Sequence, residues 1–504
     1  MAFLIVIFIF LLSFLFRGYG FFVNYPFWVD EFSTAIQSQY ILKYGLSVFS
    51  NPDVYIEQHN ISTHILTAFL FQILGNQEWV ARLPSLIFGS MLPVAVFFLA
   101  KYLFNSKTGL AAALLTAFSY FEITWSRQAR SYVLLQLIMV ITTYLYFKVL
   151  DEKGNKRTDL ILLALFSLLG FITHSFFYLF LLSLIMHFVF IKKNRLIHIF
   201  NKWWIYVLFI LFIAIAKHIG LFDTFMTYFS RDGFGANNVW YYHSFLWREY
   251  SLLTFLTLIG FILAFNRKKS IFLFLSIFFI THLFFITFGF KPLVTRYVLP
   301  IFPFMLVLSA YAISHLPNLF FKNQKHILTT FASLLLTIVI VVNGDKFVNR
   351  PKYFYSVNHD FREIALVDYK QIYDRIKHRG DLDKNETAVI ETWPARTYWY
   401  VGIDYKPSYF FQWRGNLPYD VNNKGEKVVP RNNQIRLIED VDDLEKAIKT
   451  YAKGFILIDD TSLPKDVIDY VEKNMKKELY LDHYPLDDNP YSIWPVTLYS
   501  WGIK

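Results

Sequence analysis

Long apolar runs dominate the first two thirds of this 504-residue sequence and constrain its fold more than any other feature. Each run is close to the length that an α-helix needs to cross a lipid bilayer. Of all residues, 55% are hydrophobic and only 17% are charged, which is too little charge to cover a soluble protein of this size. The sequence therefore predicts a polytopic α-helical membrane protein. The predicted transmembrane helices, about eleven in number, cover residues 1–20, 84–104, 108–124, 131–150, 159–173, 176–191, 203–219, 251–265, 270–289, 297–315 and 327–343.

Charged residues are distributed unevenly between these runs. Up to Asn343 the chain has 25 Lys and Arg residues against 12 Asp and Glu, whereas from Gly344 onward it has 24 against 26. In the first part the basic residues cluster in every second loop, at Lys153, Lys156 and Arg157, at Lys192, Lys193 and Arg195, at Arg267, Lys268 and Lys269, and at Lys322 and Lys325. Short basic loops stay in the cytoplasm. The N-terminus is therefore predicted to be cytoplasmic, and everything after Asn343 extracytoplasmic.

The composition also excludes several functions. A nucleic-acid-binding protein would concentrate its basic excess on a folded surface or a tail, whereas here it occupies short loops, so no nucleic-acid partner is expected. The sequence has no cysteine, which excludes disulfides, thiolate metal sites and cysteine nucleophiles. The opening apolar run lacks a basic start and a small-residue cleavage site, so it is predicted to be a retained helix rather than a signal peptide.

The first extracytoplasmic loop, about residues 21–83, is predicted to contain a helix. Apolar residues recur at helical spacing between Ile61 and Leu74, with polar residues between them. Such a helix either lies on the membrane interface or packs under an outer domain, and both alternatives keep the loop near the lipid surface.

The chain changes character at Gly344, where charge becomes dense and turn residues appear. Short β-like runs, TAVIE near Val389 and GFILID near Ile456, alternate with helical stretches such as DDLEKAIKTYA. This alternation predicts a small extracytoplasmic α/β domain over residues 344–504, following a membrane domain over residues 1–343.

Polar residues with catalytic potential gather in the loops on the extracytoplasmic side. Asp30 and Glu31 directly follow the first span, and one of them could act as a general base. Arg127 and Arg130 are three residues apart, so on a helix both guanidinium groups would point to one side, where their planar forks suit a phosphate. Arg296 opens a later span in the same plane. Singly, the acidic pair also fits a helix cap and the arginines also fit snorkelling to headgroups, but together they predict a site that binds a lipid phosphate and deprotonates an acceptor.

Histidine and tyrosine residues on the same side are candidate contacts for a sugar or an acceptor. The histidines could hydrogen-bond a sugar, tune a carboxylate or be satisfied interface residues. Asp30 and Glu31 also offer hard oxygen ligands that suit Mg²⁺ or Mn²⁺, but arginines alone could neutralise a phosphate, so metal dependence stays open. The candidate contact residues are His59, His64, Tyr132, His174 and Tyr297.

Five motifs in order resemble the GT-C glycosyltransferases, in the branch related to protein O-mannosyltransferases and aminoarabinose transferases (families 39 and 83). They are the acidic pair after the first span, WVARLPSLIFGSMLPVAVFFLAKYLF, SRQARSYVLL, THSFFYLFLL at His174 and TRYVLPIFPFML. The resemblance covers about residues 25–310, with Ser131 where family members commonly have a proline. It implies a GT-C fold, a polyprenyl-phosphate or dolichyl-phosphate sugar as donor, a cavity at the outer membrane surface, and a catalytic role for Asp30, with Glu31 as the second candidate.

The hypothesis from these residues is an inverting transfer of a sugar from a lipid monophosphate to an extracytoplasmic hydroxyl or amine. Arg127, Arg130 and Arg296 would hold the phosphate, a leaving group that needs no acid, so a single base suffices, unlike glycoside hydrolysis. A transporter or flippase for lipid-linked sugars is one alternative, although it would be expected to carry mid-membrane charges or repeated, interrupted spans. A non-catalytic membrane scaffold is the other. The expected partners are the donor lipid, membrane lipid and an extracytoplasmic acceptor.

Overall fold

The computed structural model describes most of the chain, and its contacts divide it into two compact units. Unit 1 comprises Met1–Arg17, Leu86–Ser126 and Ser131–Pro351, and unit 2 comprises Gly18–Ser85, Arg127–Arg130 and Lys352–Lys504. The predicted domain boundary between residues 343 and 344 stays a prediction. The described residues are 2–23, 26–50, 60–151, 156–192, 236–320, 326–355, 367–379, 386–393, 395–405, 408–411, 420–422, 427–429, 432–459, 464–482 and 495–503, with single residues 210, 214, 217 and 382.

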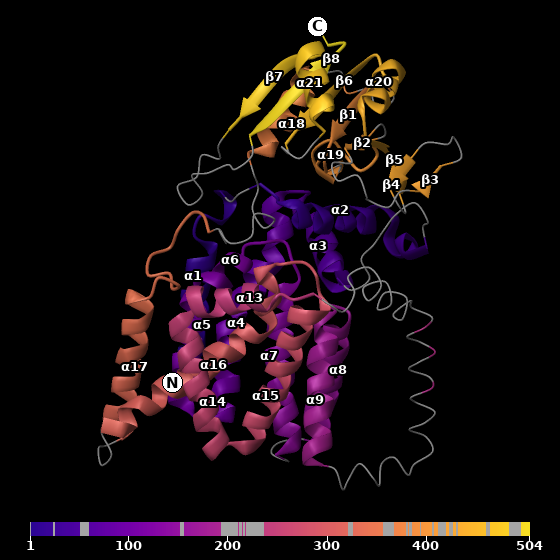
Figure 1. Ribbon diagram of the computed structural model, residues 1–504. Helices are drawn as coiled ribbons and strands as arrows, with labels where there is room; N and C mark the ends of the chain where they lie inside the picture. Colours follow the sequence, from indigo (N-terminus) through magenta and orange to yellow (C-terminus); the bar gives the residue numbers. More distant parts are fainter. Residues whose placement is uncertain are drawn as a thin grey trace. The chain divides into compact units, whose positions relative to one another are not determined.

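Unit 1 is a bundle of helices (Figure 1). Its central helix is α16, which packs against α5, α14 and α17. Gly260 allows α14 to approach α16 closely, because a Cβ atom there would lie 2.3 Å from the carbonyl oxygen of Leu308. The elements of this unit are α1 (Ala2–Gly18), α4 (Glu78–Leu103, from Leu86 onward), α5 (Ser106–Phe118), α6 (Tyr120–Trp125), α7 (Tyr132–Leu150), α8 (Lys156–Phe171), α9 (Phe176–Ile191), α13 (Val239–Ser244), η4 (Phe245–Glu249), α14 (Ser251–Arg267), α15 (Lys269–Phe284), η5 (Phe285–Gly289), η6 (Thr295–Ile301), α16 (Phe302–Phe320) and α17 (His326–Asn343).

Several helices have the length and composition of membrane spans. Within the described residues, five qualify, and a sixth does if α13–η4 and α14 form one span bent by 97°. On α1, the outward side chains Leu4, Phe8, Leu11 and Leu15 recur at helical spacing, as on a lipid-facing helix. The protein is therefore an integral membrane protein. The predicted total of eleven spans stays a prediction, since the span predicted at residues 203–219 lies largely outside the described residues.

Helix α3 (Ile61–Leu74) confirms the helix predicted in the first loop. It packs against α2 (Val29–Tyr44) in unit 2. Its polar residues His64 and Thr67 are buried, whereas the apolar residues Phe69 and Ile73 are exposed. An apolar face turned outward and a polar face turned inward is the arrangement expected of a helix at a lipid surface.

The C-terminal part of unit 2 is built on an eight-stranded sheet in the order β3-β4-β5-β2-β1-β6-β8-β7. The four central strands β5, β2, β1 and β6 run parallel, and the outer strands are antiparallel. The predicted strands near Val389 and Ile456 and the helix before the second one are confirmed as β1, β6 and α20. The elements are α18 (Tyr369–Arg379), β1 (Thr387–Glu391), α19 (Ala395–Tyr400), β2 (Ser408–Phe411), β3 (Asp420–Val421), β4 (Lys427–Val429), β5 (Asn432–Ile438), α20 (Val441–Thr450), β6 (Lys453–Ile458), α21 (Lys465–Asn474), β7 (Lys476–Leu481) and β8 (Val496–Trp501).

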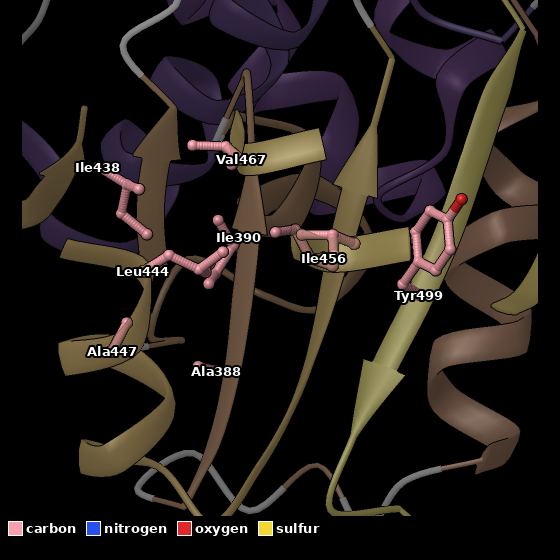
Figure 2. Packing of buried hydrophobic residues seen from close by; sticks show 9 residues of the cluster. Ala388, Ile390, Ile438, Leu444, Ala447, Ile456, Val467 and Tyr499 are labelled. Atoms are coloured by element: carbon pink, nitrogen blue, oxygen red, sulfur yellow. The ribbon is translucent and has the colours of Figure 1, made fainter. Parts of the chain in front are cut away.

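Two apolar cores cover the two faces of this sheet. On one face, Ile390 and Ile456 pack with Leu444 of α20 and Val467 of α21 (Figure 2). On the other face, alternate apolar residues of β6 and β8 pack with α18. Successive side chains of a strand point to opposite faces, so a strand buried on both sides reads as a continuous apolar run, as GFILI does.

Candidate functional site

The predicted acidic pair lies in the first turn of α2, where carboxylates interact favourably with the helix dipole. Glu31 is fully buried. Arg82 donates to both of its carboxylate oxygens, from Nε to Oε1 at 2.7 Å and from Nη2 to Oε2 at 2.6 Å. The backbone N–H groups of Ala129 and Trp28 also donate to Glu31, at 2.7 and 3.4 Å. This carboxylate is held on both oxygens and is placed to fix the chain around it.

Asp30 has a different environment from that of its neighbour. Its side chain is 26% exposed, and its Oδ2 lies 3.6 Å from Nη2 of Arg130. Arg130 also donates to the carbonyl oxygen of Asp30 at 3.1 Å and to Oγ1 of Thr34 at 3.3 Å. This ion pair is longer than a hydrogen bond, and the Asp30 side chain is partly exposed.

Arg127 is buried and binds backbone carbonyl groups. It donates to the carbonyl oxygens of Tyr19 at 2.5 Å, Gly20 at 3.1 Å and Tyr353 at 2.8 Å. Gly20 has a φ of +64°, and a Cβ atom there would lie 2.8 Å from Cα of Tyr353, so only glycine fits this contact. Burial lowers the pKa of the Arg127 guanidinium to about 10, which still leaves it cationic at neutral pH.

One expectation about the two arginines is wrong. Residues 127–130 form a turn between α6 and α7 rather than a helix, so Arg127 and Arg130 do not project from one helical face. The reason is that backbone groups of this segment bond elsewhere: the N–H of Ala129 donates to Glu31, and the carbonyl of Arg130 accepts from Ser85 Oγ at 3.1 Å. The segment is thereby tied to α2 and to the start of α4.

Arg82 is a site residue that the sequence analysis missed. It lies within the motif WVARLP, one turn after Glu78 at the start of α4, and is 3% exposed. The available signal was weak: an arginine at the start of an apolar span can reach the headgroups, and only its burial in the fold calls for an acidic partner. Its partner, Glu31, is 51 positions away in the chain.

In unit 1, two of the predicted contact residues lie against Phe176, and a third lies against one of those two. The ring of His174 lies 4.8 Å from that of Tyr132 and 5.0 Å from that of Phe176, and the ring of Tyr297 lies 5.0 Å from that of Phe176. The backbone N–H of Phe176 donates to Nδ1 of His174 at 3.1 Å. The structure thus brings Tyr132, His174 and Tyr297 into one aromatic cluster.

Arg296 and Tyr297 lie on η6, whose backbone is held by side chains from other helices. Pro300 has no N–H to donate to the carbonyl of Tyr297 three residues earlier, and His282 Nε2 lies 2.6 Å from that oxygen instead. Gln136 of α7 donates to the carbonyl of Leu299 at 2.8 Å. These contacts fix the backbone that carries Arg296.

The remaining candidates are His64 and His59. His64 is fully buried on α3, and His59 lies outside the described residues. In the part of the chain that the structure describes, no group of three or more His, Asp or Glu side chains is arranged to hold a metal ion. Both oxygens of Glu31 already accept from Arg82, so this carboxylate does not fit a metal site.

The chain is similar to known proteins both in part of its sequence and in its fold. Residues 58–220 match the family described as dolichyl-phosphate-mannose-protein mannosyltransferase. The structure is similar to that of ArnT from Cupriavidus metallidurans bound to undecaprenyl phosphate, with a TM-score of 0.64, 11% identity, and coverage of 99% of this chain and 97% of ArnT. For ArnT in the apo state the TM-score is 0.61 at 11% identity, with coverage of 95% and 94%.

These similarities establish the class of fold. At 11% identity the match to ArnT shows the fold alone, and it extends over nearly the whole length of both chains. No curated protein matches the sequence. The chain has a GT-C fold similar to that of ArnT, so the resemblance predicted from the sequence is confirmed.

Proposed function

We propose that the protein is a membrane glycosyltransferase that moves a sugar from a polyprenyl-phosphate or dolichyl-phosphate donor to an extracytoplasmic acceptor. The observation that carries this proposal is the contrast between two adjacent carboxylates. Glu31 is buried and held by Arg82, whereas Asp30 is partly exposed beside Arg130. The GT-C fold and the undecaprenyl phosphate bound to ArnT support the donor class.

In the proposed reaction Asp30 is the general base. It takes the proton from the acceptor hydroxyl or amine while the acceptor atom attacks the anomeric carbon from the side opposite the phosphate. The bond between the anomeric carbon and the phosphate oxygen breaks, both electrons leave with the lipid phosphate, and the configuration inverts. The proton stays on Asp30 until it exchanges with water.

The cations of unit 2 have different tasks in this mechanism. Arg130 lies beside Asp30 and is placed to neutralise negative charge that develops there. Arg82 fixes Glu31 and, through Ala129, the turn that carries Arg130. The contacts of Arg127 with three carbonyl groups favour a structural task, so its predicted phosphate contact stays a prediction, as does that of Arg296.

A comparison of carboxamide variants tests the mechanism. Purified wild type, Asp30→Asn and Glu31→Gln are supplied with polyprenyl-phosphate sugars and membrane extract, and sugar release is followed. Asp30→Asn is expected to lower kcat about a thousand-fold, the range of general-base catalysis, with unchanged thermal stability. Asp404→Asn is the matched control, because Asp404 pairs with Lys43 at the other end of α2 and is exposed.

Two outcomes would contradict the proposal. Full turnover by Asp30→Asn, Glu31→Gln and the double variant would remove the catalytic assignment. Movement of the intact donor across proteoliposome membranes without sugar release would favour the transporter alternative. Mass spectrometry of lipids and glycans from a deletion strain would identify the acceptor class.

The orientation in the membrane is part of the same proposal, with the N-terminus cytoplasmic and residues 344–504 extracytoplasmic. The absence of native cysteine makes single-cysteine labelling free of background. A cysteine in place of the exposed Lys449 is expected to react with an impermeant maleimide from outside intact cells. A cysteine in place of Lys268, in the loop between α14 and α15, is expected to react only after permeabilisation, and the reverse pattern would overturn the orientation.

A further inference from the structure

Helix α19 connects the C-terminal sheet to the helix that carries the acidic pair. Helix α19 follows β1 in the chain. The next strand, β2, pairs with one edge of β1, and the later strand β6 pairs with the other edge. The carboxyl end of β1 is thus the switch point of the parallel part of this sheet, where functional elements of open α/β sheets commonly lie. From this point α19 packs against α2.

Aromatic side chains form the first part of this contact. The ring of Trp399 lies 5.1 Å from that of Phe27 and 5.8 Å from that of Phe71, and the ring of Tyr400 lies 5.8 Å from that of Phe32. Phe27 and Phe32 are fully buried and flank the acidic pair on either side in the sequence. The aromatic residues of α19 therefore pack around the turn that presents Asp30.

A polar contact from α19 reaches Glu78, which interacts with Arg82, the partner of Glu31. The hydroxyl of Tyr400 donates to Oε1 of Glu78 at 2.7 Å. Glu78 is one helical turn before Arg82 on α4, and Arg82 interacts electrostatically with both Glu78 and Glu31. Tyr400 is thus connected to Glu31 through two charged side chains.

The other side of α19 is anchored in the sheet. The ring of Tyr373 from α18 stacks on that of Tyr400, with centroids 4.9 Å apart and an angle of 20°. The hydroxyl of Tyr373 donates to Glu391 at 2.8 Å, and the N–H of Thr397 donates to the same carboxylate at 3.1 Å. Arg396 pairs with Asp459 at the end of β6. The buried side chains of this anchor are Tyr373, Glu391, Thr397, Arg396 and Asp459, and they leave α19 little freedom to move.

We infer that α19 is a positioning element for the catalytic turn of α2, and that Tyr400 is the positioning residue through which the C-terminal sheet holds Asp30 in place. This inference rests on the proposed function. Tyr400 contacts neither the sugar donor nor the acceptor. It acts by keeping the side chains of Glu78, Arg82 and Glu31 in their relative positions. A catalytic group displaced by about 1 Å loses on the order of a hundred-fold in rate, so support of this kind has a measurable effect.

The test compares two tyrosine-to-phenylalanine variants. Tyr400→Phe removes the hydroxyl that reaches Glu78 and keeps the stacked ring. Tyr405→Phe is the matched control, because the buried hydroxyl of Tyr405 donates to the carbonyl of Thr387 within the sheet. Tyr400→Phe is expected to lower kcat about ten-fold or more with an unchanged KM for the donor, whereas Tyr405→Phe is expected to change thermal stability without changing kcat.

Coupling to Glu78 is measured with a double-mutant cycle. If Tyr400 acts through Glu78, the variant with both Tyr400→Phe and Glu78→Ala loses no more kcat than Glu78→Ala alone. Additive losses would show that the hydroxyl acts by another route and would overturn the inference. Equal kcat for wild type and Tyr400→Phe would overturn it as well, while leaving the proposed function intact.

A second measurement does not depend on activity. Hydrogen exchange of residues 28–36 is expected to be faster in Tyr400→Phe than in wild type and Tyr405→Phe, because the first turn of α2 loses support. If no donor is turned over by the wild type, the proposed function fails, and the positioning inference is decided by this exchange alone. Unchanged exchange in Tyr400→Phe would then reject it.

Discussion

The first turn of α2 in unit 2 and the η6 segment in unit 1 both carry predicted site residues, yet they are held by different kinds of contact. In unit 2, Glu31 and Arg82 form a buried bidentate ion pair. In unit 1, the η6 backbone is held by neutral side chains, His282 and Gln136, bonded to carbonyl oxygens. Isolated charges are costly within a membrane bundle, where neutral hydrogen bonds satisfy the backbone at lower cost. The two segments therefore should respond differently to substitution.

The largest effect is expected where one partner of the buried pair is removed. Arg82→Ala leaves Glu31 buried without its main cation, which typically costs about 3–5 kcal/mol. The midpoint of thermal unfolding in detergent is expected to fall by several degrees or more, with loss of sugar transfer. Lys43→Ala is the control, since the exposed pair of Lys43 with Asp404 is worth less than about 1 kcal/mol. Equal shifts of the thermal midpoint in both variants would show that the buried pair contributes no more to stability than the exposed pair.

A pH-dependent effect is expected in the sheet part of unit 2. Burial raises the pKa of Glu391 from its ordinary value of 4.5 to about 7, although Arg396 and hydrogen bonds from Thr397 and Tyr373 act in the opposite direction. Because the folded state binds this proton more tightly than the unfolded state, the contribution is fully present below pH 4.5 and is lost as the pH rises through about 7. Stability is expected to fall between pH 5 and pH 8 by up to about 3 kcal/mol.

The matched variant for this effect is Glu391→Gln, which cannot titrate. Its thermal midpoint is expected to change less than that of wild type over the same pH range. An identical pH dependence in wild type and Glu391→Gln would assign the effect to other groups.

The smallest effect is expected in unit 1. His282→Phe removes the donor that replaces the missing N–H of Pro300, which costs about 1–3 kcal/mol for a buried carbonyl group. His243→Phe, at an exposed position, is the control and should stay within about 0.5 kcal/mol. Comparison of the two thermal midpoints checks the prediction. An effect of His282→Phe as large as that of Arg82→Ala would break the contrast between the two segments.

Much of the fold was predictable because apolar periodicity and length are local properties. The helices at α7, α9 and α14 and the helix α3 in the first loop lie within a few residues of their predicted ranges. The strands β1 and β6 were visible as apolar runs between helical stretches. The sequence could not reveal that residues 127–130 fold with the first loop and the C-terminal part, because that depends on contacts between distant segments.

For the candidate site, the sequence predicted which residues take part but not what each of them does. Residue type and side of the membrane selected Asp30, Glu31, Arg127 and Arg130, and the structure places all four in unit 2. Their individual tasks were not predictable, since Arg127 binds carbonyl groups from two distant segments and Arg82 did not stand out within an apolar run. Arg296 belongs to unit 1, and its place beside Asp30 stays a prediction.

The sequence by itself determined that the protein lies in a membrane, that polar residues collect between particular spans, and that two adjacent carboxylates are the leading candidates for chemistry. These conclusions depend on hydrophobicity and charge, which each residue carries wherever it lies. The sequence already favours Asp30 over Glu31 as the catalytic candidate, and only the tertiary structure shows how differently the two carboxylates are held. Glu31 is held by Arg82 and by Ala129, 51 and 98 positions away, whereas Asp30 is left partly exposed. Adjacent residues on a helix point about 100° apart, so one turn of α2 buries one carboxylate and presents the other.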